Sequence, residues 1–503
     1  MSAVLLPLLL GLPALGAAVL ALPRLAPRAA LAVAATTSGA TLVVAAVVAA
    51  RFDYGAGGRM QGVVDARWLP AIDVRFHLGV DGISLPLVLL TALLTVLCVL
   101  WTAGAPPTAG RVRQLLALVL LLQVGVLGTF LALDLVLFFL FFEVVLIPMY
   151  FLIAVWGGPA RGPAAMKFIL FTLLGSALMF VAFVVLYAAT GTFDMVALAH
   201  AHGRGIGAST QLLAFVLLLI GFGIKSPLWP LHTWLPDAHT EAPTVGSVLL
   251  AGVLLKMGTY GLVRIALADA PDGARRAAPA LAVLAVVGIV YAALACLAIA
   301  RAGAGDLKRL IAFSSVGHMG FVLLGIATLT PVGVQGALIG NIAHGVITGL
   351  LFFLVGGVKE RFHTSDMDEI GGGLLAKTPA LGGLTLFAAI ASLGLPGLAG
   401  FWGEMLAMLG AWSPAPSQSR PLFLVLMALA GLGTVLTAAY FLTMLRRVDF
   451  GVVTHPWRNV HVGDVVVADL VAWVPLVVLA VGIGLWPELV LGVSESAVRG
   501  LLG

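Results

Sequence analysis

Charge is scarce in this chain: only 10% of its 503 residues are Asp, Glu, Lys or Arg, whereas 61% are hydrophobic and the mean hydropathy is +1.13. A soluble domain needs more polar surface than this composition supplies. Apolar runs of about 20 residues, the length that spans a bilayer, recur along the chain. The sequence therefore predicts an all-α polytopic membrane protein. Loop arginines account for the net charge of +5, which gives no indication of nucleic-acid binding.

Cysteine is nearly absent, and both examples, Cys98 and Cys296, lie in apolar runs. Two isolated cysteines of this kind suit neither a disulfide framework nor a metal cluster. Walker A, Rossmann, CxxC and haem-attachment patterns are also absent, so no nucleotide, iron–sulfur or haem site is predicted. Residues 1–23 lack the basic start of a secretory signal and are expected to form a retained helix.

The apolar runs predict fourteen membrane spans. They cover roughly residues 1–23, 28–50, 82–103, 112–132, 134–156, 163–190, 210–234, 243–266, 277–300, 308–327, 332–357, 378–410, 421–446 and 465–490. Residues 51–81, between spans 2 and 3, alternate in polarity and predict an extramembrane hairpin. Loops after odd-numbered spans hold 15 Lys and Arg residues, against 10 in the other loops and termini. This bias places both termini on the outer side of the membrane.

Two of the predicted spans contain helix-breaking residues. Pro227 and Pro230 interrupt span 7, and Pro396 interrupts span 12 within a Gly-rich stretch. Each broken span is the fourth of a five-span block, either spans 4–8 or spans 9–13, which predicts two inverted five-helix repeats. The chain is accordingly divided into residues 1–111 (spans 1–3 and the 51–81 loop), 112–266, 277–446 and 447–503 (span 14).

Three charges fall inside predicted spans 5, 7 and 8. Glu143 is about nine residues into span 5, near mid-bilayer, with no basic residue close in sequence. Lys225 and Lys256 are two of only six lysines, against 21 arginines. Arginine stays protonated, whereas a buried lysine can release a proton, so these lysines predict proton exchange. The alternatives are a structural ion pair for Glu143 and lysines that extend to the interface.

His318 and His344 lie in the adjacent spans 10 and 11, and Glu404 follows the break in span 12. The histidines are predicted to form a proton relay, or alternatively to be satisfied core residues. Glu404 is predicted to be a terminal proton site, or alternatively a helix-capping acid. Water and four polar side chains could link these groups: Ser314, Ser315, Asn341 and Thr348.

Other polar residues carry weaker signals. A cluster between spans 7 and 8 matches no metal-ligand spacing and predicts a hydrogen-bonded entrance loop; its members are His232, Asp237, His239 and Glu241. Asp134 is expected to cap the start of span 5. Residues 362–372 form an acidic patch that is expected to face solvent or a partner.

Several motifs resemble one known family. They are VDGISLPLVLLT, FFEVVLIPMYFLI, DLKRLIAFSSVGHMG, GLPGLAGFWGE and the long stretch of residues 221–262, which begins GFGIKSPLWPLHTWLPDAHTEAP. They resemble the antiporter-like, proton-translocating membrane subunits of respiratory complex I (NADH–quinone oxidoreductase). Sister subunits usually carry lysine at the position of Glu404, so the glutamate favours the subunit M branch.

The resemblance implies a fourteen-helix core with inverted repeats. It also implies that Glu143 and Lys225 are a coupled pair, that Lys256 is the central lysine, that His318 and His344 lie on a hydrated axis, and that Glu404 is the terminal site. FMN, iron–sulfur clusters and quinone would be bound by other subunits and none by this chain. The implied partners are the sister antiporter-like subunits and the lipids of a bacterial inner membrane. Three alternatives remain: a sodium/proton antiporter subunit, a membrane-bound hydrogenase subunit and an inactive scaffold.

Overall fold

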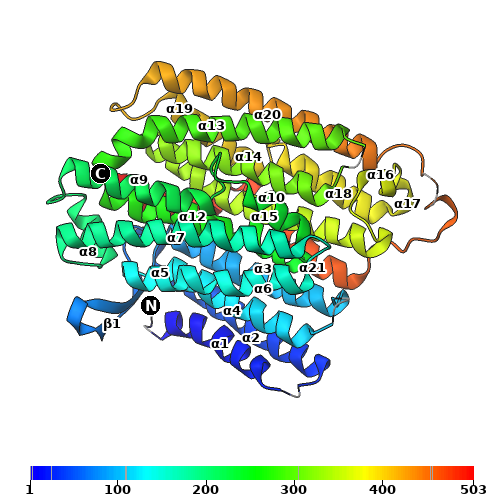
Figure 1. The fold of residues 1–503 in the computed structure, drawn as a ribbon, viewed down its shortest axis with the longest axis horizontal. Coiled ribbons are helices and arrows are strands. Elements are labelled where there is room, and N and C mark those ends of the chain that lie inside the picture. Colours follow the sequence, from blue (N-terminus) through cyan, green and yellow to red (C-terminus); the bar gives the residue numbers. More distant parts are fainter. Residues whose placement is uncertain are drawn as a thin grey trace.

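The computed structural model describes residues 2, 4–23, 25–107, 110–303, 305–453, 455 and 457–502. Long helices run side by side along one direction, with chain ends and connections gathered at the two ends of the bundle (Figure 1). Among the described residues, twelve helical segments are long and apolar enough to cross a membrane, and two further apolar helices, α1 and α18, are shorter. The all-α membrane architecture is confirmed, whereas the count of fourteen spans stays a prediction.

Helices occur at each predicted span. Their bounds are α1 Leu5–Ala21, α2 Pro27–Ala50, α3 Ser84–Gly104, α4 Val112–Leu131, α5 Leu135–Val144, α6 Leu146–Trp156, α7 Arg161–Thr190, α9 Ala208–Lys225, α10 Trp234–Glu241, α11 Thr244–Leu249, α12 Leu255–Gly261, α13 Pro271–Arg301, α14 Leu307–Ala327, α15 Pro331–Phe362, α18 Pro379–Ser392, α19 Ala399–Trp412, α20 Arg420–Val448 and α21 Val467–Leu485. Four shorter helices lie outside the predicted spans or beyond their ends: α8 Met195–Ala201, α16 Met367–Ile370, α17 Leu374–Lys377 and α22 Glu488–Leu502.

Both predicted helix breaks are present. In span 7, α9 ends at Lys225 and α10 begins at Trp234, with Pro227 and Pro230 in the non-helical residues between them. In span 12, α18 ends at Ser392 and α19 begins at Ala399, with Pro396 between them. Proline breaks a helix because it has no N–H and its ring clashes with the preceding turn.

Spans 5 and 8 show irregularities that the sequence analysis did not predict. Span 5 is interrupted at Val145, between α5 and α6, where Pro148 cannot donate to the carbonyl of Val144. Span 8 contains two π-helical segments, η3 (Leu250–Leu254) and η4 (Leu262–Leu267), on either side of α12. Insertions of this kind widen one helical turn and are frequent at functional sites.

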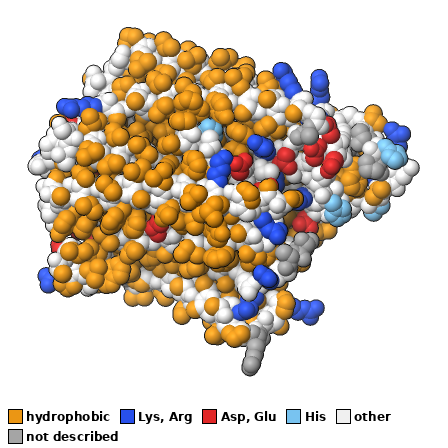
Figure 2. Space-filling view, in the orientation of Figure 1, with side chains coloured by type: hydrophobic (Ala, Val, Ile, Leu, Met, Phe, Trp, Pro, Cys, Tyr) orange, Lys and Arg blue, Asp and Glu red, His pale blue; other side chains and the backbone are white. Residues whose placement is uncertain are grey.

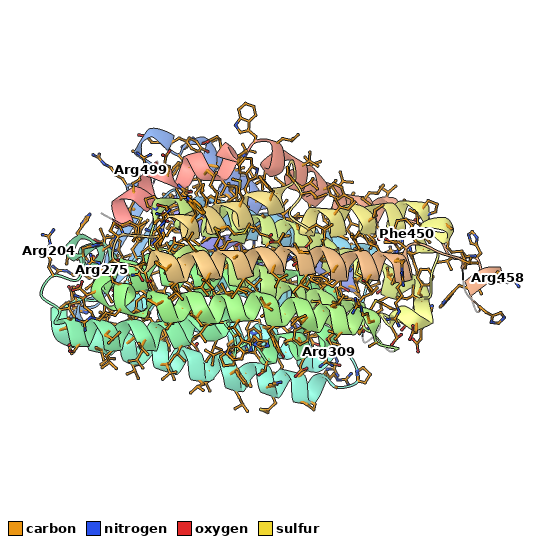
Figure 3. All side chains as sticks on the ribbon, turned by 90° about the horizontal axis from the view of Figure 1, so that it is seen from above. Arg204, Arg275, Arg309, Phe450, Arg458 and Arg499 are labelled. Carbon is orange, nitrogen blue, oxygen red and sulfur yellow. The ribbon has the colours of Figure 1, made fainter. Side chains whose placement is uncertain are left out.

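The loop between α2 and α3 forms the predicted hairpin, in which β1 (Gln61–Leu69) pairs antiparallel with β2 (Val74–Val80). We call the end of the bundle that carries β1, α8 and both chain termini the hairpin end, and the other the opposite end (Figure 1). Charged side chains gather near the opposite end in the face shown, whereas an apolar band covers much of the rest (Figure 2). Labelled arginines lie at both ends, with Arg275 and Arg499 at the hairpin end and Arg309 and Arg458 at the other (Figure 3).

Two matching pairs of helix caps are consistent with the predicted inverted repeats. At the hairpin end, the side chains of Asp134 and Asp194 cap the starts of α5 and α8, and the two residues form an isolated bridge. Asp306 and Asp366 cap α14 and α16 in the same way and form the equivalent bridge at the opposite end. Asp134 is thus the N-cap that the sequence predicted. The two cap pairs occupy equivalent positions in spans 4–8 and 9–13, at opposite ends of the bundle.

The middle of the bundle is closely packed through glycines. A Cβ atom on Gly345 of α15 would lie 2.7 Å from the carbonyl oxygen of Gly252 in span 8. A Cβ atom on Gly403 of α19 would lie 2.6 Å from the Cα of Gly340 in α15. Helix backbones approach this closely only where both partners are small. Span 8, α15 and α19 are therefore held together at the level of the intramembrane charges.

Candidate functional site

Lys225 is the last residue of α9, at the break in span 7, and its side chain is buried. Its Nζ lies 5.0 Å from the ring centroid of Phe142 and 6.0 Å from that of Phe168. The Nε1 of Trp234, at the start of α10, donates to the carbonyl oxygen of Ile224 at 3.0 Å. This bond satisfies a carbonyl that the break leaves without a helical partner. The break therefore positions a buried amine among aromatic faces, where a cation is stabilised.

Glu143 lies near the end of α5, one turn before Pro148, and is partly exposed on the surface of the chain. Its carboxylate lies within electrostatic range of the buried Lys225 amine. Among the residues that the structure describes, no nitrogen–oxygen distance of 4.0 Å or less joins Glu143 to Lys225. The two groups therefore interact through space and not as a contact ion pair.

Lys256 is fully buried in α12, between the two π-helical segments. Its Nζ donates to the carbonyl oxygen of Ala251 at 2.5 Å and lies 2.6 Å from the Nδ1 of His344 on α15. The carbonyl belongs to the residue five positions earlier, in η3, where the wider π turn has altered the regular hydrogen-bond pattern. The irregular backbone thus supplies one of the two partners of the central lysine.

The two predicted relay histidines contact each other. Their ring centroids are 5.8 Å apart with the rings steeply inclined. The Nδ1 of His318 lies 3.2 Å from Oε1 of Glu404, and its Nε2 lies 2.9 Å from the hydroxyl of Ser392. The hydroxyl of Thr434 donates to the other oxygen of Glu404 at 3.2 Å. His318 is therefore a bridge between His344 and the carboxylate of Glu404.

Glu404 is the sixth residue of α19 and therefore lies beyond its first turn. The alternative that it is a helix-capping acid is wrong, because its oxygens bond to side chains of α14 and α20. Gly394, in the break of span 12, has φ of +74°, and a Cβ there would lie 3.2 Å from the Glu404 carboxylate. The break therefore brings the backbone over the carboxylate at a position that favours glycine.

A cavity of about 30 Å³ lies among these groups, lined by His318, His344, Thr348, Ser392 and Glu404. Such a volume accommodates about one water molecule with several polar partners. Of the four polar side chains suggested as links, Thr348 lines this cavity. The hydroxyls of Ser314 and Ser315 instead donate back to the carbonyl of Ile311 in their own helix.

The fourth suggested link, Asn341, accepts a hydrogen bond from the hydroxyl of Thr259 at 3.0 Å. Thr259 lies on α12, three residues after Lys256. Asn341 therefore joins α15 to span 8 beside the central lysine and not to the histidines.

The polar cluster that the sequence assigned to an entrance loop between spans 7 and 8 lies mostly in a helix. Asp237, His239 and Glu241 lie in α10, the second half of the broken helix, because span 7 continues beyond residue 234. The carboxylate of Asp237 pairs with Lys167 at 2.7 Å, and that of Glu241 accepts from the backbone N–H of Ala160 at 2.9 Å. These carboxylates therefore have separate structural partners.

His239 is a candidate residue that the sequence analysis did not separate from this cluster. It is fully buried and stacked on Phe352 at 4.5 Å, and neither ring nitrogen has a hydrogen-bond partner among the described residues. It lies within electrostatic range of Lys256 and of Lys308 on α14. The only signal in the sequence was a histidine in an amphipathic turn after Pro236.

Lys308 lies between His239 and the surface at the opposite end of the bundle. It donates to the backbone carbonyls of Ala242 and Thr240. With Glu241 and the exposed Lys359 it lines a pocket of about 210 Å³. Polar groups thus extend from the surface at the opposite end, past Lys308, towards His239 and Lys256.

Comparisons with known proteins show which family the chain belongs to. Residues 132–437 match the family described as NADH:quinone oxidoreductase/Mrp antiporter, transmembrane. The chain belongs to this family. A relative named NADH-quinone oxidoreductase subunit M, from Rhodobacter capsulatus, is 40% identical over 93% of this chain and 90% of its own length. The resemblance to the subunit M branch is thus confirmed.

Further members of the family extend the comparison. NAD(P)H-quinone oxidoreductase chain 4 3 from Trichormus variabilis is 43% identical over 86% of this chain and 78% of its own length. A chain of respiratory complex I from Thermus thermophilus has a TM-score of 0.85 at 30% identity, over 99% of this chain and 100% of its own. A chain of the Mrp complex from Dietzia also has a TM-score of 0.85, but its 22% identity supports only the shared fold.

Proposed function

We propose that this chain is a proton-translocating membrane-arm subunit, of the subunit M type, in a bacterial NADH–quinone oxidoreductase. It lies in the inner membrane beside the sister antiporter-like subunits of the complex. The redox chemistry, with FMN, iron–sulfur clusters and quinone, belongs to other subunits. The identity of 40% to a subunit M over nearly the full length of both chains favours this assignment over a sodium/proton antiporter or a hydrogenase subunit.

The observation that carries the proposal is the series of adjacent exchangeable groups from Lys256 through His344 and His318 to Glu404, in which no direct hydrogen bond joins the two imidazoles among the described residues. The Lys256 ammonium gives a proton to the Nδ1 of His344, and a water in the adjoining cavity passes a proton on to His318. His318 then delivers a proton to Glu404. Each step joins two groups that can exchange protons, which is the requirement for a relay across an apolar region.

Glu143 and Lys225 control the charge state of Lys256 from a distance. Two charges 4 Å apart at an effective dielectric of 20 interact by about 4 kcal/mol, and one pKa unit corresponds to about 1.4 kcal/mol. No nitrogen–oxygen distance of 4.0 Å or less joins Glu143 and Lys225 in the described part of the chain. Closing them to a contact pair is therefore the change that introduces an interaction of this size and loads or releases a proton at a neighbouring amine. Such a change is the local consequence of a remote conformational or electrostatic event in the complex.

Protons enter from the opposite end of the bundle. The loops after odd-numbered spans, which hold more Lys and Arg, lie at that end, and the positive-inside bias assigns them to the cytoplasm. The pocket beside Lys308 gives access there, and His239 lies between this pocket and Lys256. Both termini then lie on the outer side.

The test is NADH-driven acidification of inverted membrane vesicles that contain the assembled complex with Glu143→Gln. The matched control is Glu495→Gln, because Glu495 is an exposed acid paired only with Arg499. Loss of NADH-driven acidification in the first variant alone supports the proposal. Normal acidification combined with reduced sodium tolerance of the cells would replace it with the antiporter function.

A further inference from the structure

A second buried cluster of charged groups lies on the helix that carries Lys256, towards the hairpin end. Tyr260 and Arg264 follow Lys256 at intervals of four residues, so the three side chains share one face of span 8. Eight residues correspond to about 12 Å along the helix axis. The sequence analysis did not single out Arg264, two residues before the end of predicted span 8, but in the structure its side chain is buried in η4.

Arg264 is fixed by an ion pair. Its Nη2 lies 2.5 Å from Oδ1 of Asp81, which is also buried. The same carboxylate oxygen accepts hydrogen bonds from the backbone N–H groups of Ile83 and Ser84, each at 3.1 Å, where α3 begins. The guanidinium is thus held by a carboxylate that is itself anchored to the backbone, so the pair has little freedom to move.

Tyr260 fills the turn between the two basic residues. The guanidinium carbon of Arg264 lies 5.5 Å from the Tyr260 ring centroid, and the tyrosine hydroxyl donates to the carbonyl oxygen of Phe130 at 3.2 Å. Phe130 packs edge-on against the tyrosine ring at 5.2 Å. On the face that Lys256 and Arg264 share, the buried hydroxyl of Tyr260 therefore lies between the two basic side chains, with aromatic packing around it.

A pocket of about 600 Å³ reaches this cluster from the hairpin end. Asp81 and Arg264 line its inner part, and the exposed residues Arg59 and His200 line it as well. Water can therefore approach the guanidinium from the surface at this end. Lys256 would lie only two helical turns further in, and protons on it would have a short route to that surface.

Asp269 adds an unpaired carboxyl group at the same place. Its side chain is buried, and neither oxygen has a hydrogen-bond partner among the described residues. Burial raises the pKa of Asp269 well above its ordinary value, while Arg264 opposes this rise. A carboxyl group able to accept a proton therefore lies within electrostatic range of the guanidinium.

We propose that Arg264, held by Asp81, is a barrier that closes the direct route from Lys256 to the hairpin-end pocket. The inference rests on the proposed role of Lys256 in proton translocation. A guanidinium keeps its proton under nearly all conditions, so it cannot relay one. Because Asp81 fixes it in place, the guanidinium occupies the route between Lys256 and the pocket without passing a proton on. Protons on the outer side, at the hairpin end, are thereby prevented from returning directly to Lys256, and protons on Lys256 are directed to His344.

The experiment uses vesicles that contain the assembled complex, and follows the decay of the proton gradient after NADH is exhausted. Arg264→Gln is compared with Arg275→Gln, because Arg275 is an exposed arginine at the same end. The gradient is expected to decay several-fold faster in the Arg264 variant, with NADH oxidation preserved. The double variant Arg264→Gln/Lys256→Met is expected to restore the slow decay, because the leak passes through Lys256.

If Arg264→Gln prevents assembly, Arg264→Lys takes its place. A lysine keeps the charge opposite Asp81 but can release a proton when buried, so the leak is expected there too, whereas a purely structural arginine would be replaced without a leak. A decay equal to that of the control in an assembled variant overturns the barrier. If Lys256→Met alone leaves pumping intact, the proposed function fails; if it lowers pumping while Arg264 variants do not leak, only the barrier fails.

Discussion

The Nζ of Lys256 lies 2.6 Å from the Nδ1 of His344, although the two residues are 88 positions apart in the chain. A protonated lysine can donate to this nitrogen only when the imidazole nitrogen is unprotonated. The contact therefore couples the protonation states of the two groups, since both cannot direct a proton at the same point. Close packing at Gly252 and Gly345 maintains it.

Replacement of this lysine tests the relay directly. Lys256→Met keeps a long unbranched side chain but removes the exchangeable proton, so proton pumping per NADH oxidised is expected to fall. The control is Arg309→Met, which alters an exposed basic residue at the opposite end that does not line the entrance pocket. The measurement compares fluorescence quenching of a pH-sensitive dye with the NADH oxidation rate. Equal pumping by both variants would contradict the proposed role of Lys256.

Glu404→Gln tests the end of the relay. The amide keeps hydrogen-bonding capacity for His318 and Thr434 but cannot take up a proton, so pumping is expected to fall while the complex still assembles. A hydrogen bond to a charged group contributes about 1.5–3 kcal/mol, so the thermal midpoint is expected to decrease modestly. Glu404→Asp serves as the conservative comparison and is expected to retain part of the pumping. A glutamine variant that pumps like the parent would exclude Glu404 as a proton site.

His239→Phe tests the entrance from the opposite end. Phenylalanine preserves stacking on Phe352 but has no nitrogen to bind a proton, so pumping is expected to slow. The matched control is His232→Phe, because His232 is a buried histidine of the same broken span that packs against Tyr291. If the His232 variant is impaired and the His239 variant is normal, protons enter by a different route.

Gly403→Ala tests the close packing of α15 and α19. The added Cβ would lie 2.6 Å from the Cα of Gly340, so the helices must separate. Overpacking of this kind costs about 1–3 kcal/mol, and the thermal midpoint of the purified complex should decrease. Gly431→Ala on α20 is the control, since its Cβ would meet no atom within 4 Å. A midpoint lowered equally by both changes would show that the contact is unimportant.

Asp449 predicts a dependence of stability on pH. It follows α20, is buried, has no side-chain hydrogen bond among the described residues, and has its pKa raised by burial to about 7. The unfolded carboxyl titrates near its ordinary value of 3.8. Between pH 3.8 and about 7 the Asp449 carboxyl is protonated in the folded state and ionised in the unfolded state. The free energy of unfolding therefore decreases as the pH rises from about 4 towards 7.

Asp449→Asn removes this loss, which is at most about 4 kcal/mol for a shift of this size. The thermal midpoint of the variant should exceed that of the parent at pH 8 and match it near the acidic limit. Glu360→Gln changes an exposed acid at the same end and serves as the control. A constant difference between Asp449→Asn and the parent across this pH range would contradict the assignment.

The sequence by itself determined the membrane class, the position of each apolar helix and the two proline breaks, because these depend on local composition and on proline geometry. It also identified Glu143, Lys225, Lys256, His318, His344 and Glu404, since isolated ionisable residues in apolar runs are conspicuous. The kink at Val145 and the π segments beside Lys256 were not predicted, because hydropathy does not report local hydrogen-bond shifts.

Only the tertiary structure decided how these residues are connected. The order Lys256, His344, His318 and Glu404 depends on which faces of span 8, α14, α15 and α19 meet, and close approaches of glycine backbones set those faces. The same packing buried Arg264 against Asp81, a pair that the sequence analysis did not single out. Contacts between helices far apart in the chain arise from packing of the whole bundle, and no local pattern specifies them.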